Sequence, residues 1–188
     1  MGMLLAFAPF IVFAVLERFV GPMWGLASAT VVSAALLLRD VLAPGRQAKI
    51  LEIGTFVLFG GLTAYMWLMG ARLSVIGVRL YVDVGLLLIV LVSMAMRTPF
   101  TLQYAREQVP AELWNKPSFL HTNYVITGAW AVAFALIVLA ELALLYLPNM
   151  PHRLGVIAIV VALVGAFKFT AWYPAKVRES KTAADTQT

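Results

Sequence analysis

Residues 123–147 read NYVITGAWAVAFALIVLAELALLYL, and this stretch decides the fold class. It holds a single charged residue, Glu141, among apolar and small polar side chains. A helix needs about 20 such residues to cross the hydrocarbon core of a bilayer. Because the stretch exceeds that length without a helix-breaking residue, it predicts a transmembrane helix.

The rest of the chain has the same character. Of its 188 residues, 62% are hydrophobic and 12% are charged. A globular domain is about 45–50% apolar and about 25% charged. Lipid solvates so much apolar surface, and helices satisfy their own backbone groups in lipid. The composition therefore predicts an all-α, polytopic membrane bundle over residues 1–175. The net charge of +5 lies mainly between apolar runs, so nucleic acid is not an expected partner.

Six apolar runs mark the expected spans. They lie near residues 3–20, 23–38, 50–68, 78–96, 123–147 and 154–173. The second run is short for a span, so a five-span alternative lays one of the first two segments in the membrane interface. Residues 176–188 are polar and are expected to form a disordered tail.

Basic residues in the connections predict the orientation. The first, third and fifth connections hold four of them: Arg18, Arg72, Arg79 and Arg153. The second and fourth connections and the tail hold nine: Arg39, Arg46, Lys49, Arg97, Arg106, Lys116, Lys176, Arg178 and Lys181. Cytoplasmic loops are the richer in Lys and Arg. Six spans then place both termini in the cytoplasm, with the chain in a bacterial inner membrane.

Four ionisable residues, Glu17, Arg79, Asp83 and Glu141, fall near the expected outer ends of spans. Ionisable groups in spans are functional candidates. Glu141 is the deepest, about 9 Å from Leu147 by helix rise, and we expect an arginine or a hydroxyl of another span to hold it inside the bundle. Arg79 and Asp83 are spaced to pair on one helix. Two interpretations stay open, a vestibule that handles protons or cations and a set of structural ion pairs.

The longest connection is expected to contact lipid or a partner protein. Thr98-Pro99 predicts the start of a short interfacial helix that ends near Gln108. Aromatic side chains of such a helix would sit in the interface, and basic ones would meet anionic headgroups or a partner. The candidate contact residues are Arg97, Phe100, Tyr104, Arg106, Trp114 and Lys116.

Small residues recur at a spacing of four in two runs. Gly25 and Ala29 form one pair, and Ala158, Ala162 and Ala166 form a longer stripe. Such stripes let helix backbones approach closely, either inside one bundle or between copies in a homo-oligomer. Packing inside the bundle is the favoured interpretation.

Motifs for catalysis are missing from the sequence. The chain has no cysteine, so it has no thiolate site. His121 and His152 are expected on opposite sides of the membrane, too far apart to share zinc or haem. No phosphate loop, dinucleotide fingerprint or nucleophile elbow occurs. The sequence therefore predicts no catalytic residue, no cofactor and no metal.

Several short stretches are similar to the intracellular septation protein A family. The matching pieces, in chain order, are Leu4–Phe13, Leu58–Thr63 with its glycine pair, Arg97–Phe100, Trp114, Asn123 and Trp130. The resemblance implies a non-enzymatic protein of the bacterial inner membrane that acts in septation or envelope maintenance. Its partners would be other envelope or division proteins.

Three functions follow as hypotheses. The first is the septation or envelope role, carried out through protein contacts. The second is a small proton- or cation-coupled transporter or channel that uses Glu17, Asp83 and Glu141. The third is an accessory subunit of a larger membrane complex.

Overall fold

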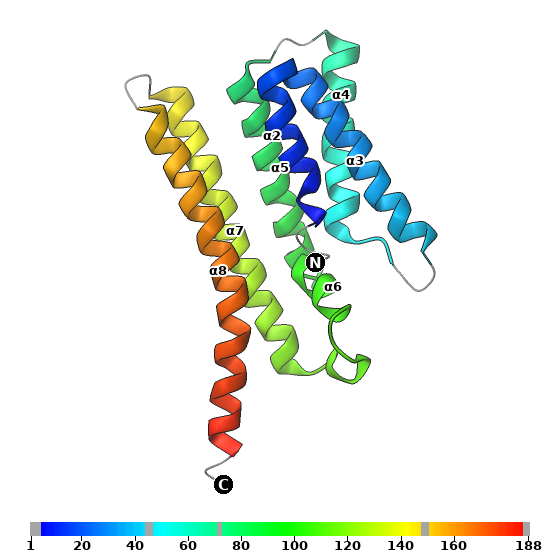
Figure 1. Cartoon of the computed structure of the whole chain (residues 1–188), viewed down its shortest axis with the longest axis vertical. Helices are drawn as coiled ribbons and strands as arrows, with labels where there is room; N and C mark the ends of the chain where they lie inside the picture. The colour runs from blue at the N-terminus through cyan, green and yellow to red at the C-terminus, as the bar shows by residue number, and fades with distance from the viewer. Residues whose placement is uncertain (1–4, 44–46, 71–72, 148–150, 186–188) are drawn as a thin grey trace.

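The computed structural model describes residues 5–43, 47–70, 73–147 and 151–185. Within these residues the chain is helical and contains no strand, which confirms the all-α prediction (Figure 1). The helices are α2 (Ala8–Val20), α3 (Pro22–Leu42), α4 (Ile50–Met69), α5 (Val75–Ala95), α6 (Phe100–Arg106), the 3₁₀ helix η1 (Ala111–Leu113), α7 (Pro117–Tyr146) and α8 (His152–Asp185).

The helices pack in the order in which they follow each other, with α6 set against the start of α7. Helix α2 packs on α3, α3 on α4, α4 on α5, α5 on α7, and α7 on α8. The α2–α3 turn, the start of α5 and the end of α7 lie at one end of the molecule, which we call the hairpin end. The end of α3, helix α6 and the start of α7 lie toward the opposite end, which we call the α6 end (Figure 1).

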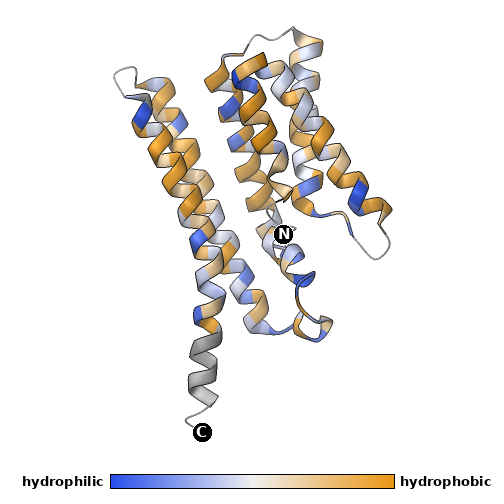
Figure 2. Cartoon of the chain, in the orientation of Figure 1, coloured by the Kyte–Doolittle hydropathy of each residue, from blue (hydrophilic) through white to orange (hydrophobic). Residues whose placement is uncertain are grey.

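Among the described residues, five helices are long and apolar enough to cross a membrane: α3, α4, α5, α7 and the part of α8 from Arg153 to Val177. Apolar residues predominate along much of these helices (Figure 2), and many point outward, with Val31 68% and Val57 64% exposed. Lipid solvates such side chains. Helix α2 has 13 residues and covers about 20 Å of a hydrocarbon core about 30 Å thick. The sixth expected span is therefore not among these five helices.

Helices α3 and α8 extend beyond the apolar runs that predicted them. Helix α3 has 21 residues, so the helix that contains the second apolar run is long enough to cross a membrane. The tail expected from residue 176 instead continues α8 to Asp185, and residues 186–188 lie outside the described part. Its sequence, AKVRESKTAAD, is rich in good helix formers, which explains why polarity ends the apolar run there but does not end the helix.

Small residues of α3 fix the position of Glu17 on α2. A Cβ atom added to Gly25 would lie 3.0 Å from the backbone nitrogen of Glu17, so α2 rests directly on the α3 backbone. Ala29 is fully buried in the same interface. On α8, Ala166 is buried in the core whereas Ala158 is exposed. The Gly25–Ala29 pair thus packs inside the bundle, as predicted.

The orientation of the bundle stays a prediction that cysteine labelling tests. Gln47 and Gln108 are exposed at the α6 end, and Ser74 is exposed at the hairpin end. Because the basic residues favour a cytoplasmic α6 end, Gln47→Cys and Gln108→Cys should resist an impermeant thiol reagent in intact cells, whereas Ser74→Cys should react. All three should react in permeabilised cells. The reverse pattern in intact cells would invert the orientation.

Candidate functional site

Charged side chains, several of them buried, gather at both ends of the bundle. The hairpin-end cluster consists of Glu17 of α2, Arg79 and Asp83 of α5, and Glu141 of α7. Glu17 is 3% exposed and Glu141 is 4% exposed. Nε and Nη2 of Arg79 both contact Oε1 of Glu17. Charge-assisted hydrogen bonds of this kind are stronger than neutral ones, so the pair fastens α2 to α5.

The carboxyl groups of Asp83 and Glu141 are hydrogen-bond partners. Asp83 and Glu141 share a side-chain hydrogen bond between α5 and α7. An ionised carboxylate only accepts hydrogen bonds, so this bond needs a proton on one of the two groups. The charges of Arg79 and Glu17 act on both members of the pair. The cluster therefore combines one guanidinium, one carboxylate bound to it, and a pair of carboxyl groups that can share a proton.

The cluster lies within the helices and still reaches the surface. Asp83 is about 12 Å along α5 from its start at Val75, and Glu141 is about 8 Å from the end of α7 at Tyr146. The side chain of Arg79 is 41% exposed, whereas that of Glu17 is fully buried. Arg79 thus connects the buried carboxyl groups with the exterior of the hairpin end.

Three of the expectations for these residues are decided by the geometry. Glu141 faces the bundle interior, as predicted. Its hydrogen-bond partner is the carboxyl of Asp83 and not the expected arginine or hydroxyl, although the charge of Arg79 also acts on it. The expected Arg79–Asp83 pair is replaced by Arg79–Glu17, since Glu17 is buried within reach on α2. In the described residues, no group of three or more His, Cys, Asp or Glu side chains is arranged to hold a metal ion.

The α6-end cluster centres on Lys49, the residue before α4. Its ammonium contacts the carboxylate of Asp40, at the end of α3, and lies 2.9 Å from Oε1 of Glu107 and 3.7 Å from Oε1 of Glu52. The side chain of Lys49 is 5% exposed and that of Asp40 is fully buried. Burial acts to lower the pKa of Lys49, but the hydrogen bonds to Asp40 and Glu107 outweigh it, and the pKa is raised.

Helix α6 joins this cluster through two more contacts. The Tyr104 hydroxyl lies 3.5 Å from Oε1 of Glu52, and the backbone N–H of Ile50 donates to Oε1 of Gln103 at 2.8 Å. Burial, together with the charge of Glu52, raises the pKa of Tyr104 above its ordinary value. The cluster therefore ties α3, α4 and α6 together. Lys49 and Glu52 are three residues apart in the sequence, and both side chains are buried in this cluster.

Two of the residues expected to contact lipid are in the core. Phe100 is fully buried and Tyr104 is 2% exposed, so the prediction that they anchor the connection in the interface is wrong. Arg97 has a φ of 58°, in the left-handed region, and lies between α5 and α6. The N–H of Phe100 then donates to Oγ of Ser93 at 3.2 Å. These features turn α6 back against the bundle.

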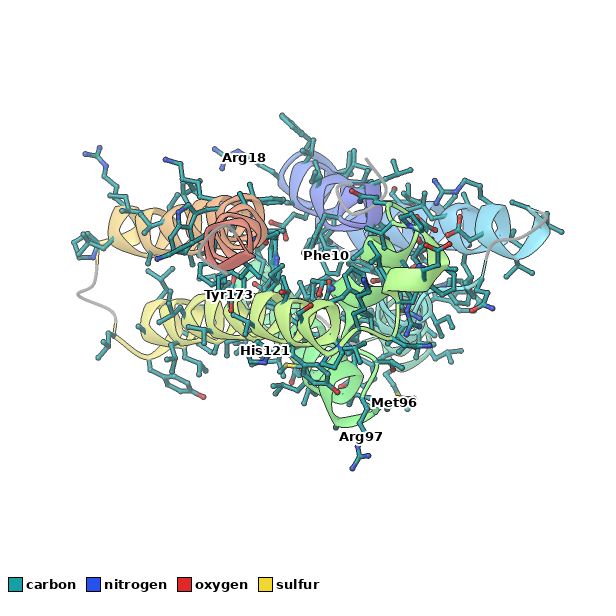
Figure 3. All side chains as sticks on the ribbon, turned by 90° about the horizontal axis from the view of Figure 1, so that it is seen from below. Phe10, Arg18, Met96, Arg97, His121 and Tyr173 are labelled. Carbon is teal, nitrogen blue, oxygen red and sulfur yellow. The ribbon has the colours of Figure 1, made fainter. Side chains whose placement is uncertain are left out.

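The remaining candidate contact residues are on the surface. Arg97 projects away from the bundle (Figure 3). Trp114 is 37% exposed, and the guanidinium of Arg106 lies 5.6 Å from the centre of its ring. Lys116 is exposed just before α7. These four side chains form the polar and aromatic surface of the α6 end.

Asp40 is the buried charge that sequence reasoning missed. It occupies the last turn of α3, where the helix dipole disfavours a negative charge. An acidic residue in that position needs cations nearby, and Arg39 and Lys49 supply them. That mismatch with the helix dipole is the sequence signal that points to Asp40.

Comparison with protein-family models, with curated proteins and with solved structures finds no match to this chain.

Proposed function

We propose that this chain is a small proton-handling membrane protein of the transporter or channel class, and that the Asp83–Glu141 pair takes up and releases the proton. The observation that carries the proposal is the hydrogen bond between these two carboxyl groups inside the bundle. Carboxyl groups that face the interior of a membrane bundle are the usual parts of proton relays.

The neighbours of the pair fit this role. When the proton leaves, two carboxylates face each other at short range, which is unfavourable unless a cation is near. Arg79 supplies that positive charge and is partly exposed at the hairpin end. Because Glu17 holds the guanidinium in place, Arg79 stays beside the pair in both protonation states. Proton exchange then occurs through the Arg79 side of the cluster.

A second candidate function is the septation or envelope role that the family resemblance implies. The surface formed by Arg97, Arg106, Trp114 and Lys116 supports it. The indole N–H of Trp114 donates to the backbone oxygens of Arg106 and Val109, each at 3.2 Å. An aromatic side chain held in this way loses little entropy on contact with a partner. This function requires no proton flux, so the same assay separates the two candidates.

Proton flux into liposomes tests the proposal. Liposomes that contain the purified protein and a pH-sensitive dye should acidify faster after an external acid pulse than protein-free liposomes. Glu141→Gln should reduce the rate to the protein-free level, because the amide keeps the shape of the side chain and its hydrogen bonds but does not titrate. Asp83→Asn should have the same effect.

Glu112→Gln is the matched control. It removes one carboxylate from an exposed position on η1 at the opposite end, so flux should stay at the wild-type rate. Thermal unfolding of the same preparations reports whether a variant is folded. Wild-type flux in folded Glu141→Gln, or no flux in the wild type, would contradict the proposal, and the second result would favour the protein-contact function.

A further inference from the structure

A cavity of about 630 Å³ opens at the α6 end, between α6, the first turns of α7 and residues Thr170–Val177 of α8. Pockets for small molecules measure about 300–1,000 Å³. The cavity lies at the opposite end from the hairpin-end cluster and takes no part in the proposed proton chemistry.

The polar groups of the cavity wall are largely bonded to the wall itself. Oγ1 of Thr101 donates to the backbone oxygen of Asn123 at 3.0 Å. The side-chain amide of Asn123 donates to the oxygen of Phe119 at 2.9 Å, and Oγ1 of Thr122 to that of Ser118 at 2.8 Å. Apolar wall residues include Val109, Leu113, Ile126 and Pro174. A wall whose polar groups are already bonded favours an apolar occupant.

The mouth of the cavity is positively charged. Of the described residues that line it, Lys116 is charged and none is acidic. Trp172 and Tyr173 lie on α8 beside the lining residues, and Trp and Tyr favour the membrane interface. The mouth is therefore at the level of lipid headgroups and is built to attract an anion.

Hydrogen bonds within the protein hold the cavity walls in place. Trp114 fixes the segment after α6 through its bonds to Arg106 and Val109. The hydroxyls of Thr101 and Thr127 lie 2.7 Å apart and fasten α6 to α7. A preformed cavity loses less free energy to ordering when it binds.

We propose that this cavity binds one anionic phospholipid, with the phosphate at Lys116 and an acyl chain along the apolar wall. Charge complementarity carries the choice of occupant, because the mouth has a cation and no acid while the interior is apolar. Basic pockets between membrane helices bind anionic headgroups in this way. A zwitterionic lipid carries no net negative charge to attract Lys116. Inorganic phosphate has no apolar group to contact the apolar wall.

Native mass spectrometry of the whole protein in detergent tests the proposal. The protein is titrated with phosphatidylglycerol, with phosphatidylcholine and with inorganic phosphate. One phosphatidylglycerol should bind with an affinity at least about tenfold above that of phosphatidylcholine, and phosphate alone should not bind. Lys116→Glu should weaken phosphatidylglycerol binding at least about tenfold. Ala175→Trp, an exposed change on the cavity wall, should weaken it without altering any charge.

Lys176→Glu is the matched control, since it makes the same charge change on α8 at the same interface without touching the cavity wall. Binding should stay within about twofold of wild type. If Lys176→Glu and Lys116→Glu weaken binding equally, the lipid is held by general surface charge and the proposal is wrong. Equal binding of the two lipids, binding of phosphate alone, or unchanged binding in Ala175→Trp would also overturn it.

Discussion

Lys49→Met should lower the free energy of unfolding by about 3–5 kcal/mol, the usual cost of removing one partner from a buried ion pair. Methionine keeps most of the volume but leaves Asp40, whose side chain is fully buried, and Glu52, which is nearly so, without the ammonium between them. The loss should be visible in reversible denaturation of the purified protein in micelles.

Lys168→Met is the control for this experiment. Lys168 is exposed on α8, so its replacement should change the free energy of unfolding by about 0.5 kcal/mol or less. The double variant Lys49→Met/Asp40→Asn should regain part of the loss, because it also removes the buried Asp40 charge that has lost the Lys49 ammonium. A Lys49→Met loss as small as that of Lys168→Met would show that water reaches the cluster.

The Lys49 contribution also has a defined pH dependence. Its ordinary pKa is 10.5, and the pKa in the folded protein is higher. A raised pKa stabilises the fold fully below the ordinary value and ceases to do so as the pH rises through the folded value. The Lys49 contribution is therefore constant near neutral pH and is lost only in strong alkali.

The helices follow from the sequence because hydropathy and length act locally. A long apolar run needs no information about its neighbours to be recognised as a span. The residue at which a helix begins or ends is harder to predict from hydropathy alone. Helix α7 begins at Pro117, six residues before the apolar run, because PSFLHT is polar enough to end the run but still suits a first helical turn. Helix α8 overruns its apolar part for the same reason.

The sequence predicts the depth of the residues in the hairpin-end cluster but not which residues pair with each other. Depth along a helix comes from residue number, so Glu17, Asp83 and Glu141 were expected in one layer. Their partners depend on which helices become neighbours. Arg79 had a choice between Asp83, one turn along α5, and Glu17 on α2. Glu17 is fully buried beside Gly25, and Asp83 forms a hydrogen bond with Glu141. Arg79 therefore forms its ion pair with Glu17.

Trp130→Ala should destabilise the protein by about 3–5 kcal/mol, the range for removing a large aromatic side chain from a core. Trp130 is fully buried, and its ring centre lies 5.0 Å from that of Phe7, 5.4 Å from Phe134 and 4.8 Å from Phe167. In lipid, helices associate through close packing and hydrogen bonds. A cavity in place of Trp130 removes packing contacts between these helices. Trp67→Ala is the control, because Trp67 is 74% exposed and should cost about 0.5 kcal/mol or less.

The loss should concentrate on α8, since this helix packs mainly on α7. Nε1 of Trp130 donates to Oγ1 of Thr170 on α8 at 2.9 Å. Trp130→Phe removes that bond and keeps most of the packing, so it should cost about 1 kcal/mol. Spin labels at Ser74 and Arg153, both exposed at the hairpin end, should give a broader distance distribution in Trp130→Ala than in wild type, and an unchanged one in Trp67→Ala. Equal broadening in both variants would mean that α8 is positioned by lipid contact and not by the aromatic cluster around Trp130.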